Sequence, residues 1–465
     1  MNNPILSCVI AISMTLQCHS AMAASSELPS GLCPDSGNPI LPGYYADPSV
    51  VTHDGRYYLY ATLDPWGGET LGCWSSEDFA NWEFHELNWP TKAACTSPTS
   101  KDAMVWAPSV VQGIDGAFYM YVSVGSEIWV GSANHPLGPW QNLLGDQPMI
   151  PEDFRPGYHM IDGEAFIDDD GQPWLYWGSG WNWTNGKCWV VPLEADMVTF
   201  AGEVVDVTPP HFFEAPLMVK RDGRYYLMYS DGKTIEDTYQ VHYAVGDGPT
   251  GPFVEAPNSP ILVSDHSQNI LSPGHHTVVE LEGEHYILYH RHSIPFDPEV
   301  VGRQVCMEPL EWDEHGWIRN IRPSHDGVER FARLRTSSAS EMRGQVKASS
   351  VQHSWTGADQ AQDNNYATLW KPDPEDSRPT LVMDLGKRMQ VTHQELRLEF
   401  AWKPYHFTVQ HSDDGSTWEL LEDFSLTPAK GSPVQISTPV EARCLRLVFA
   451  PDSETRPGVM EWQVF

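Results

Sequence analysis

The chain alternates hydrophobic and polar positions in short runs, and acidic residues, glycines or prolines separate the runs. Five runs share one pattern, an acidic-Gly turn followed by a strand rich in aromatic residues. An acidic-Gly pair between apolar runs is a strong β-hairpin signal, because type I′ turns need positive φ. The five turns are Asp54-Gly55, Asp115-Gly116, Asp170-Gly171, Asp222-Gly223 and Glu282-Gly283. The pattern therefore predicts five repeated hairpins.

The spacing of these hairpins predicts the fold. Their glycines recur every 52 to 61 residues, which leaves room for about four short strands in each repeat. Such units arranged around an axis form a β-propeller, so residues 37–330 are predicted to form five four-stranded blades. The 38 prolines and 36 glycines, with no long apolar stripe of period 3.6, argue against a helical fold.

Residues 340–465 contain no further copy of the repeat. Short alternating runs, at 380–385 and 444–449, follow a Ser-rich stretch. Alternation of this kind is typical of an antiparallel β-sandwich. The predicted fold class is therefore all-β, a five-bladed β-propeller followed by a β-sandwich.

The first 23 residues predict a signal peptide. An apolar run over residues 5–16 precedes Ala21-Met22-Ala23, a small-x-small cleavage site, although no Lys or Arg stands before the run. This segment predicts a secreted or periplasmic protein. No later stretch is long and apolar enough to span a bilayer.

Charge and cysteine content narrow the classes of partner and site. The formal net charge is −34, so nucleic acids and anionic membrane surfaces would be repelled. Six cysteines remain after the predicted signal peptide, without a Cys-x-x-Cys pair. They are expected to be scattered structural residues, although fifteen disulfide pairings stay open. The oligomeric state is left open as well.

Acidic residues recur just before the turns. Asp47 lies eight residues before its turn glycine, and Asp162 and Glu214 lie nine before theirs. His275 holds this place in the fifth repeat and Trp106 in the second. The innermost strands of a propeller surround one channel, so these positions should converge. Each acid alone could cap a strand, but unpaired charges are rarely buried without a function.

Clustered carboxylates suit the hydrolysis of a glycosidic bond. One acid must stay protonated to donate to the leaving oxygen, and another must be ionised on the anomeric side. A third acid nearby raises the pKa of the donor by like-charge repulsion, and burial acts in the same direction. The cluster predicts a glycoside hydrolase with a carbohydrate substrate and no cofactor required for the chemistry.

Five segments, in order, resemble signatures of glycoside hydrolase family 43. They are residues 45–49, 106–108, 161–162 with 168–171, 214–216 and 274–276. The resemblance covers most of residues 37–330. It implies an inverting, exo-acting enzyme that releases arabinofuranosyl or xylosyl units from polysaccharide or oligosaccharide. It further implies Asp47 as general base, Glu214 as general acid, and Asp162 as the group that tunes and orients the acid.

The same resemblance suggests a metal and two substrate contacts. His275 would reach a calcium-type ion or its water shell on the propeller axis, although a hydrogen-bonded core histidine is the alternative and His276 is adjacent. Trp106 is expected to be a sugar platform, or else a core residue. Arg291 is expected to bond substrate hydroxyls, or else to be structural. Gly163-Glu164 and Ser109 depart from the family pattern and leave the substrate open.

The C-terminal unit resembles the discoidin or factor-type-C sandwich, a galactose-binding-like fold. Residues 363–370, 383–386 and 412–418 carry this likeness. It implies either a carbohydrate-binding module or a packing appendage. For the propeller, a galactosidase- or fructosidase-type enzyme and a sugar-binding propeller without turnover are the alternatives. The absence of an Asn-Asp-Pro-Asn-Gly-like motif disfavours the fructan-cleaving type, and the three acids disfavour a lectin.

Overall fold

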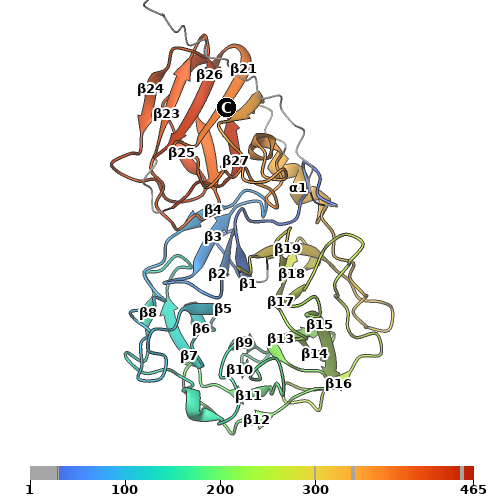
Figure 1. Cartoon of the computed structure of the whole chain (residues 1–465). Helices are drawn as coiled ribbons and strands as arrows, with labels where there is room; N and C mark the ends of the chain where they lie inside the picture. The colour runs from blue at the N-terminus through green and yellow to red at the C-terminus, as the bar shows by residue number, and fades with distance from the viewer. Residues whose placement is uncertain (1–28, 30, 298–299, 337–340, 451–454) are drawn as a thin grey trace, which may run out of the picture.

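The computed structural model describes residues 29, 31–297, 300–336, 341–450 and 455–465. They form a ring of five sheets and a two-sheet sandwich (Figure 1), which confirms the predicted all-β class. Within these ranges the one α-helix is α1 (Glu329–Thr336), and η1 (Glu152–Phe154) and η2 (Ala358–Gln362) are 3-10 turns. The predicted signal peptide lies outside the described residues. No helix in the described ranges is long and apolar enough to cross a membrane.

Four blades have four antiparallel strands each, ordered from the axis outward. Blade I contains β1 (Tyr45–His53), β2 (Arg56–Leu63), β3 (Gly72–Ser76) and β4 (Glu83–His85), and blade II contains β5 (Val105–Gln112), β6 (Phe118–Val124), β7 (Glu127–Ala133) and β8 (Gln141–Asn142). Blade III contains β9 (Glu164–Ile167), β10 (Pro173–Trp177), β11 (Trp189–Pro192) and β12 (Val205–Asp206), and blade IV contains β13 (Glu214–Arg221), β14 (Arg224–Asp231), β15 (Gln240–Gly246) and β16 (Val254–Glu255).

The fifth blade corrects the prediction of four strands in every blade. Blade V has three strands in the described ranges, β17 (Gly274–Leu281), β18 (Glu284–His292) and β19 (Arg303–Leu310). After β19 the chain leaves the blade, because Ile321 donates its backbone N–H to the carbonyl of Ile261 in the neighbouring part of the ring at 2.7 Å. No outer strand is therefore added to blade V.

The aromatic-rich second strands of the repeats hold the blades together. Alternate residues of a strand point to opposite faces, so Leu59 and Ala61 of β2 enter one hydrophobic cluster with blade V. Tyr58 and Tyr60 of the same strand enter another with blade II. Alternate side chains of β2 thus fill the gaps on the two sides of blade I.

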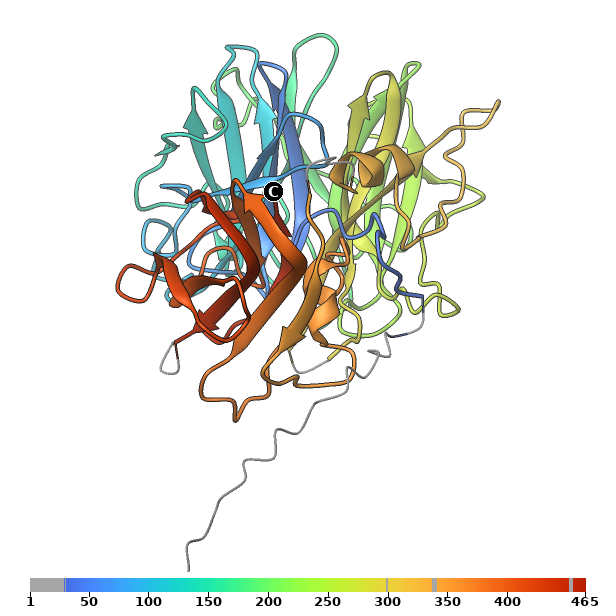
Figure 2. The same ribbon diagram turned by 90° about the horizontal axis from the view of Figure 1, so that it is seen from above.

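The C-terminal unit is a sandwich, as predicted. One sheet has the order β20-β21-β26-β23-β24 and the other β25-β22-β27. The strands are β20 (Gln345–Ala348), β21 (Thr380–Val391), β22 (Gln394–Leu398), β23 (Phe407–Ser412), β24 (Glu419–Asp423), β25 (Val434–Ile436), β26 (Val440–Phe449) and β27 (Val459–Val464). The turned view in Figure 2 shows the sandwich lying against one side of the ring. The six cysteines in the described ranges are all free.

Candidate active site

The head of each blade carries a residue in the left-handed backbone conformation. The φ values are 53° at Asp47, 45° at Ala107, 59° at Asp162, 56° at Ala215 and 39° at His275. In blades I, II, IV and V a register shift between the first two strands brackets this residue. Such β-bulges re-aim side chains beside active sites. Here four of the five positions line one pocket on the propeller axis.

Glu214 stands one position earlier than the other candidate residues. The left-handed residue of its blade is Ala215, so Glu214 corresponds to Ala46 and Trp106 of the first two blades. The expectation of one shared phase is therefore wrong for this acid. The turns that join the first two strands of blades II and III are longer than those of the other blades. A fixed count back from the turn glycine therefore reaches neighbouring but different strand positions in different blades. Both positions nevertheless face the pocket.

Side chains of one blade hold the left-handed residue of the next. The backbone N–H of Ala107 donates to Thr62 Oγ1 at 2.7 Å, that of Asp162 to Ser123 Oγ at 3.0 Å, and that of His275 to Ser230 Oγ at 2.9 Å.

The pattern changes between blades III and IV. The N–H of Ala215 donates to Asp162 Oδ2 at 3.2 Å, and the Ser179 hydroxyl, just beyond β10, donates to Glu214 Oε2 at 3.0 Å. Asp162 and Glu214 thus take part in the hydrogen bonds that join neighbouring blades. Their positions are fixed by the backbone of the ring.

Asp47 is a buried carboxylate surrounded by donors. The Thr62 hydroxyl donates to its Oδ2 at 2.6 Å. Arg303 Nη1, His275 Nδ1 and His290 Nδ1 lie 3.2, 3.2 and 3.1 Å from its Oδ1. Burial alone would raise the pKa of Asp47, but the Arg303 charge, followed by the two histidines, holds this pKa well below its ordinary value. Asp47 is therefore ionised at neutral pH, the form that a general base needs.

Glu214 and Asp162 show the opposite behaviour. Burial raises the pKa of Glu214 to about 7, although hydrogen bonds from Tyr239 and Ser179 oppose the shift. The Tyr239 hydroxyl lies 2.7 Å from Glu214 Oε1. Burial, followed by the Glu214 and Asp47 charges, raises the pKa of Asp162 well above its ordinary value. Two such acids titrate as a unit, so the pair retains a proton near neutral pH while Asp47 is ionised.

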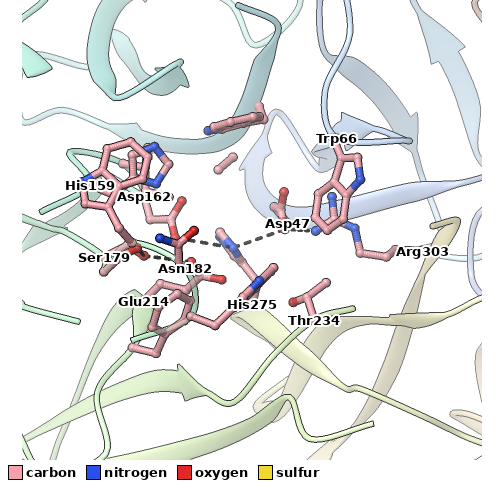
Figure 3. A pocket seen from close by; sticks show the side chains of 17 residues that line it. Asp47, Trp66, His159, Asp162, Ser179, Asn182, Glu214, Thr234, His275 and Arg303 are labelled. Carbon is pink, nitrogen blue, oxygen red and sulfur yellow. Dashed lines mark hydrogen bonds and ion pairs between the residues drawn. The ribbon is translucent and has the colours of Figure 1, made fainter. Parts of the chain in front are cut away.

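These acids line a pocket of about 280 Å³ whose walls carry aromatic rings (Figure 3). The Trp181 ring is 43% exposed and lies 4.1 Å from the His159 ring, centroid to centroid. The Trp66 ring is 39% exposed, lies over the Arg303 guanidinium, and approaches the Trp183 ring at 6.5 Å. Exposed rings with a polar edge suit a ligand that has both apolar faces and hydroxyl groups.

The sequence profile described as "Glycosyl hydrolases family 43" matches residues 36–318. The chain belongs to this family. The profile described as "F5/8 type C domain" matches residues 345–462. Family 43 relatives are glycosidases, and this protein is accordingly a glycoside hydrolase.

Three curated family 43 relatives illustrate the range of activities. The chain is 33% identical to "Beta-D-galactofuranosidase xynD" of Aspergillus niger over 63% of its length and 87% of the relative. It is 25% identical to "Arabinoxylan arabinofuranohydrolase" of Bacillus subtilis over 70% of this chain and 72% of the relative. It is 27% identical to "Beta-xylosidase" of Xylanibacter ruminicola over 60% of this chain and 97% of the relative.

Solved structures support the same assignment. A structure described as "Glycoside hydrolase" is similar over 93% of this chain and 100% of its own, with 27% identity and a TM-score of 0.78. A thermostable family-43 glycoside hydrolase is similar over 64% of this chain and 98% of its own, with 26% identity and a TM-score of 0.52. The first comparison spans the propeller and the sandwich together.

The two predicted substrate contacts have different outcomes. Trp106 lines the pocket of the family 43 propeller with its ring half-buried, so its role as a sugar platform stays a prediction. The prediction that Arg291 bonds substrate hydroxyls is wrong. Its side chain is fully buried behind the pocket, where the guanidinium contacts the carbonyl of Ser324 and the ring of His325. It points to the opposite face of β18 and cannot reach a sugar.

Sequence reasoning missed Arg303, which lines the pocket in place of Arg291. Its guanidinium donates to Asp64 through Nε and Nη2 and to Asp47 through Nη1. In the sequence, Arg303 is a single cation at the start of an apolar strand. The repeat pattern does not distinguish such a cation from a surface residue. Trp181 and Trp183 were missed too, although two tryptophans in the polar loop 178–186 are a visible signal.

His275 lies between the acids, not in a cage of metal ligands. Its Nδ1 is 3.2 Å from Asp47 Oδ1 and 3.9 Å from Asp162 Oδ2. Calcium takes six to eight oxygen ligands, whereas the nearer of these oxygens is already bound by Arg303. In the described ranges no group of three or more His, Cys, Asp or Glu residues could hold a metal ion. These side chains do not fit an ion that they alone would ligate.

Proposed function

We propose that the protein is an inverting, exo-acting glycosidase that releases arabinofuranosyl or xylosyl units from polysaccharide or oligosaccharide. One observation carries the proposal. A single pocket holds an acid whose pKa is lowered, Asp47, and an acid whose pKa is raised to about 7, Glu214. Acids with pKa values pushed apart in this way are suited to the base and acid roles of glycoside hydrolysis.

The environment of each acid supports its role. Asp47 would accept a proton from the attacking water, while Thr62 and Arg303 hold its two oxygens in place. Glu214 would donate its proton to the leaving glycosidic oxygen. Asp162, which titrates together with Glu214, would help to keep one proton on the pair near neutral pH, and it fixes the backbone beside Glu214 by accepting from Ala215 N–H. The hydrolysis needs no cofactor.

The shape of the pocket supports action at a chain end. At about 280 Å³ it lies at the small end of the roughly 300–1,000 Å³ usual for ligand sites. The contact between Trp66 and Trp183 joins loops of blades I and III at its rim. A pocket of this kind suits one terminal sugar, with the next unit reaching the exposed ring of Trp181.

A β-D-galactofuranosidase is the second candidate. The relative with that name is 33% identical to this chain, whereas the Bacillus subtilis arabinofuranohydrolase, the Xylanibacter ruminicola β-xylosidase and a Bacteroides ovatus protein named "Xylosidase/arabinosidase" are 25%, 27% and 28% identical. β-D-Galactofuranose and α-L-arabinofuranose share the configuration of every ring carbon and differ only in the substituent on C4. One pocket can therefore serve either sugar, and the room around that substituent decides between them.

A panel of nitrophenyl glycosides tests the proposal. The α-L-arabinofuranoside, β-D-xyloside and β-D-galactofuranoside would be assayed with the wild-type protein and with Glu214→Gln, and proton NMR would follow the first-formed sugar. Release of a pentose with inverted anomeric configuration is expected. Preference for galactofuranoside would favour the second candidate, and retention of configuration would move Asp47 to the role of nucleophile.

Three further proposals remain for this protein. We infer export to the periplasm or the medium from the signal-like segment at residues 1–23. An axial calcium would have to be held mostly by water, with His275 reaching its hydration shell. Carbohydrate binding by the sandwich rests on the likeness of residues 345–462 to F5/8 type C domains.

A further inference from the structure

One hydrophobic cluster, called the shared core below, contains residues of both the propeller and the sandwich, and the sandwich has a second cluster of its own. Ala401 of the sandwich is 1% exposed and belongs to the same cluster of buried side chains as Tyr45 and Trp74 of blade I. Trp402 packs against that cluster. A domain tethered only to capture substrate would meet the catalytic unit through a polar contact surface. Here the core of the catalytic unit continues into the second domain.

The shared core surrounds the start of β1, two residues before Asp47. The Tyr45 ring is fully buried between the rings of Trp74 and Trp402, at centroid distances of 5.3 and 5.6 Å and with edge-to-face geometry. The neighbouring Tyr44 ring lies 5.9 Å from Phe400 of the sandwich. Edge-to-face pairs of this kind are orientation-dependent, so the sandwich fixes the direction in which β1 enters the ring.

A second tie reaches the residue beside Arg303. Gln304 is buried on β19, and its side-chain amide donates to the carbonyl of Tyr366 in the sandwich at 3.2 Å. Arg335 of α1 joins the two units as well, because its guanidinium donates to the carbonyls of Pro39 and Asn364. Both strands that supply the Asp47–Arg303 pair are therefore anchored from the sandwich side.

The conformation of Asp47 explains what such anchoring does. A φ of 53° at a residue other than glycine is costly and persists only where the surrounding structure determines it. We propose that the sandwich is a positioning element of the active site, in which Trp402, through Tyr45, holds the strand that carries Asp47. The solved glycoside hydrolase that is similar over 93% of this chain includes both units, in keeping with a joined arrangement.

The proposal rests on the role of Asp47 as the base and is tested in the full-length protein with Trp402→Ala and Trp402→Phe. The matched control is Trp418→Ala, because Trp418 packs on Arg446 within the sandwich. Trp402→Ala is expected to lower kcat about 10- to 100-fold, the effect of a misplaced catalytic group, with little change in KM. Trp402→Phe should recover most of the loss, and Trp418→Ala should keep wild-type kcat.

The leaving-group dependence separates positioning from general damage. If Trp402 acts through Asp47, Trp402→Ala should slow substrates with good and poor leaving groups by the same factor, as is expected of Asp47→Asn. Wild-type kcat in folded Trp402→Ala, or a loss that Trp418→Ala reproduces, would overturn the inference while leaving the catalytic roles intact. Full activity of Asp47→Asn would instead overturn the proposed function.

Discussion

Arg303 Nη1 lies 3.2 Å from Asp47 Oδ1, and Nη2 of the same guanidinium lies 2.7 Å from Asp64 Oδ1. One buried cation thus contacts two buried carboxylates that come from the first blade. Because a guanidinium is planar and presents its donors as a fork, it can hold both acids at fixed positions. This arrangement lets Asp47 remain ionised although its side chain is buried.

Replacement of Arg303 by lysine should narrow the pH range of activity from the acid side. A lysine retains the charge but cannot hold Asp47 and Asp64 together, so the pKa of Asp47 should rise from its lowered value. Asp47 must be ionised to act. As the pH is lowered, the variant should therefore lose activity at a higher pH than the wild-type protein does. The measurement is the acid limb of kcat/KM, with Arg319→Lys, at an exposed arginine, as control. An unmoved acid limb in a folded variant would contradict this account.

Asp162→Asn should shift the alkaline limb of the pH dependence of kcat/KM. Glu214 donates a proton and works below its pKa of about 7, so activity falls as the pH rises through that value. Removal of the neighbouring carboxylate removes like-charge repulsion, the pKa of Glu214 falls, and the alkaline limb of kcat/KM moves to lower pH. The asparagine oxygen can still accept from Ala215 N–H. Asp169→Asn, at an exposed carboxylate, should leave the limb in place.

Glu214→Gln and Asp47→Asn should differ in their dependence on the leaving group. Without a proton donor, glycosides with poor leaving groups should lose far more rate than nitrophenyl glycosides, whose departure needs little protonation. Without a base, both kinds should lose rate alike, because water must be activated whatever departs. A series of substituted phenyl glycosides measures this. The same slope for both variants would refute the division of roles.

Trp181→Ala should separate long substrates from short ones. Its exposed ring lies at the pocket beside His159, where a second sugar would stack. Loss of one such contact is expected to reduce kcat/KM on oligosaccharides by roughly 10-fold, which corresponds to about 1.4 kcal/mol. Nitrophenyl monosides serve as the internal control and should be unaffected. An equal loss on both kinds of substrate would mean that Trp181 supports the pocket wall and does not bind a second sugar.

A chelator tests the axial ion. If calcium stands near His275, chelation should lower the activity or the melting temperature, and added calcium should restore it. His275→Ala should then show no further response to the chelator. An unchanged activity and melting temperature in the wild-type protein would leave His275 as a hydrogen-bond donor to Asp47.

The sequence predicts the ring well because its hairpins are local features. Asp-Gly turns and the alternating rings of Tyr58 and Tyr60 depend only on near neighbours. The partners of Asp47 do not, since Arg303 meets it only after the ring closes. Arg291 and Arg303 look equally suitable in the sequence, and they differ only in which face of blade V they occupy. In the part of the chain that the structure describes, blade V has three strands, and the segment after β19 pairs with distant residues.

The bonds around Asp47 join the two ends of the propeller sequence. Its contact with His290 spans 243 residues and that with Arg303 spans 256, whereas Thr62 reaches Ala107 across 45. As the chain emerges from the ribosome, N-terminal segments fold first, and the first blade exists for a long interval without its cation. Its carboxylate must meanwhile remain in water. Catalytic competence therefore cannot precede the synthesis of the last blade, which supplies Arg303.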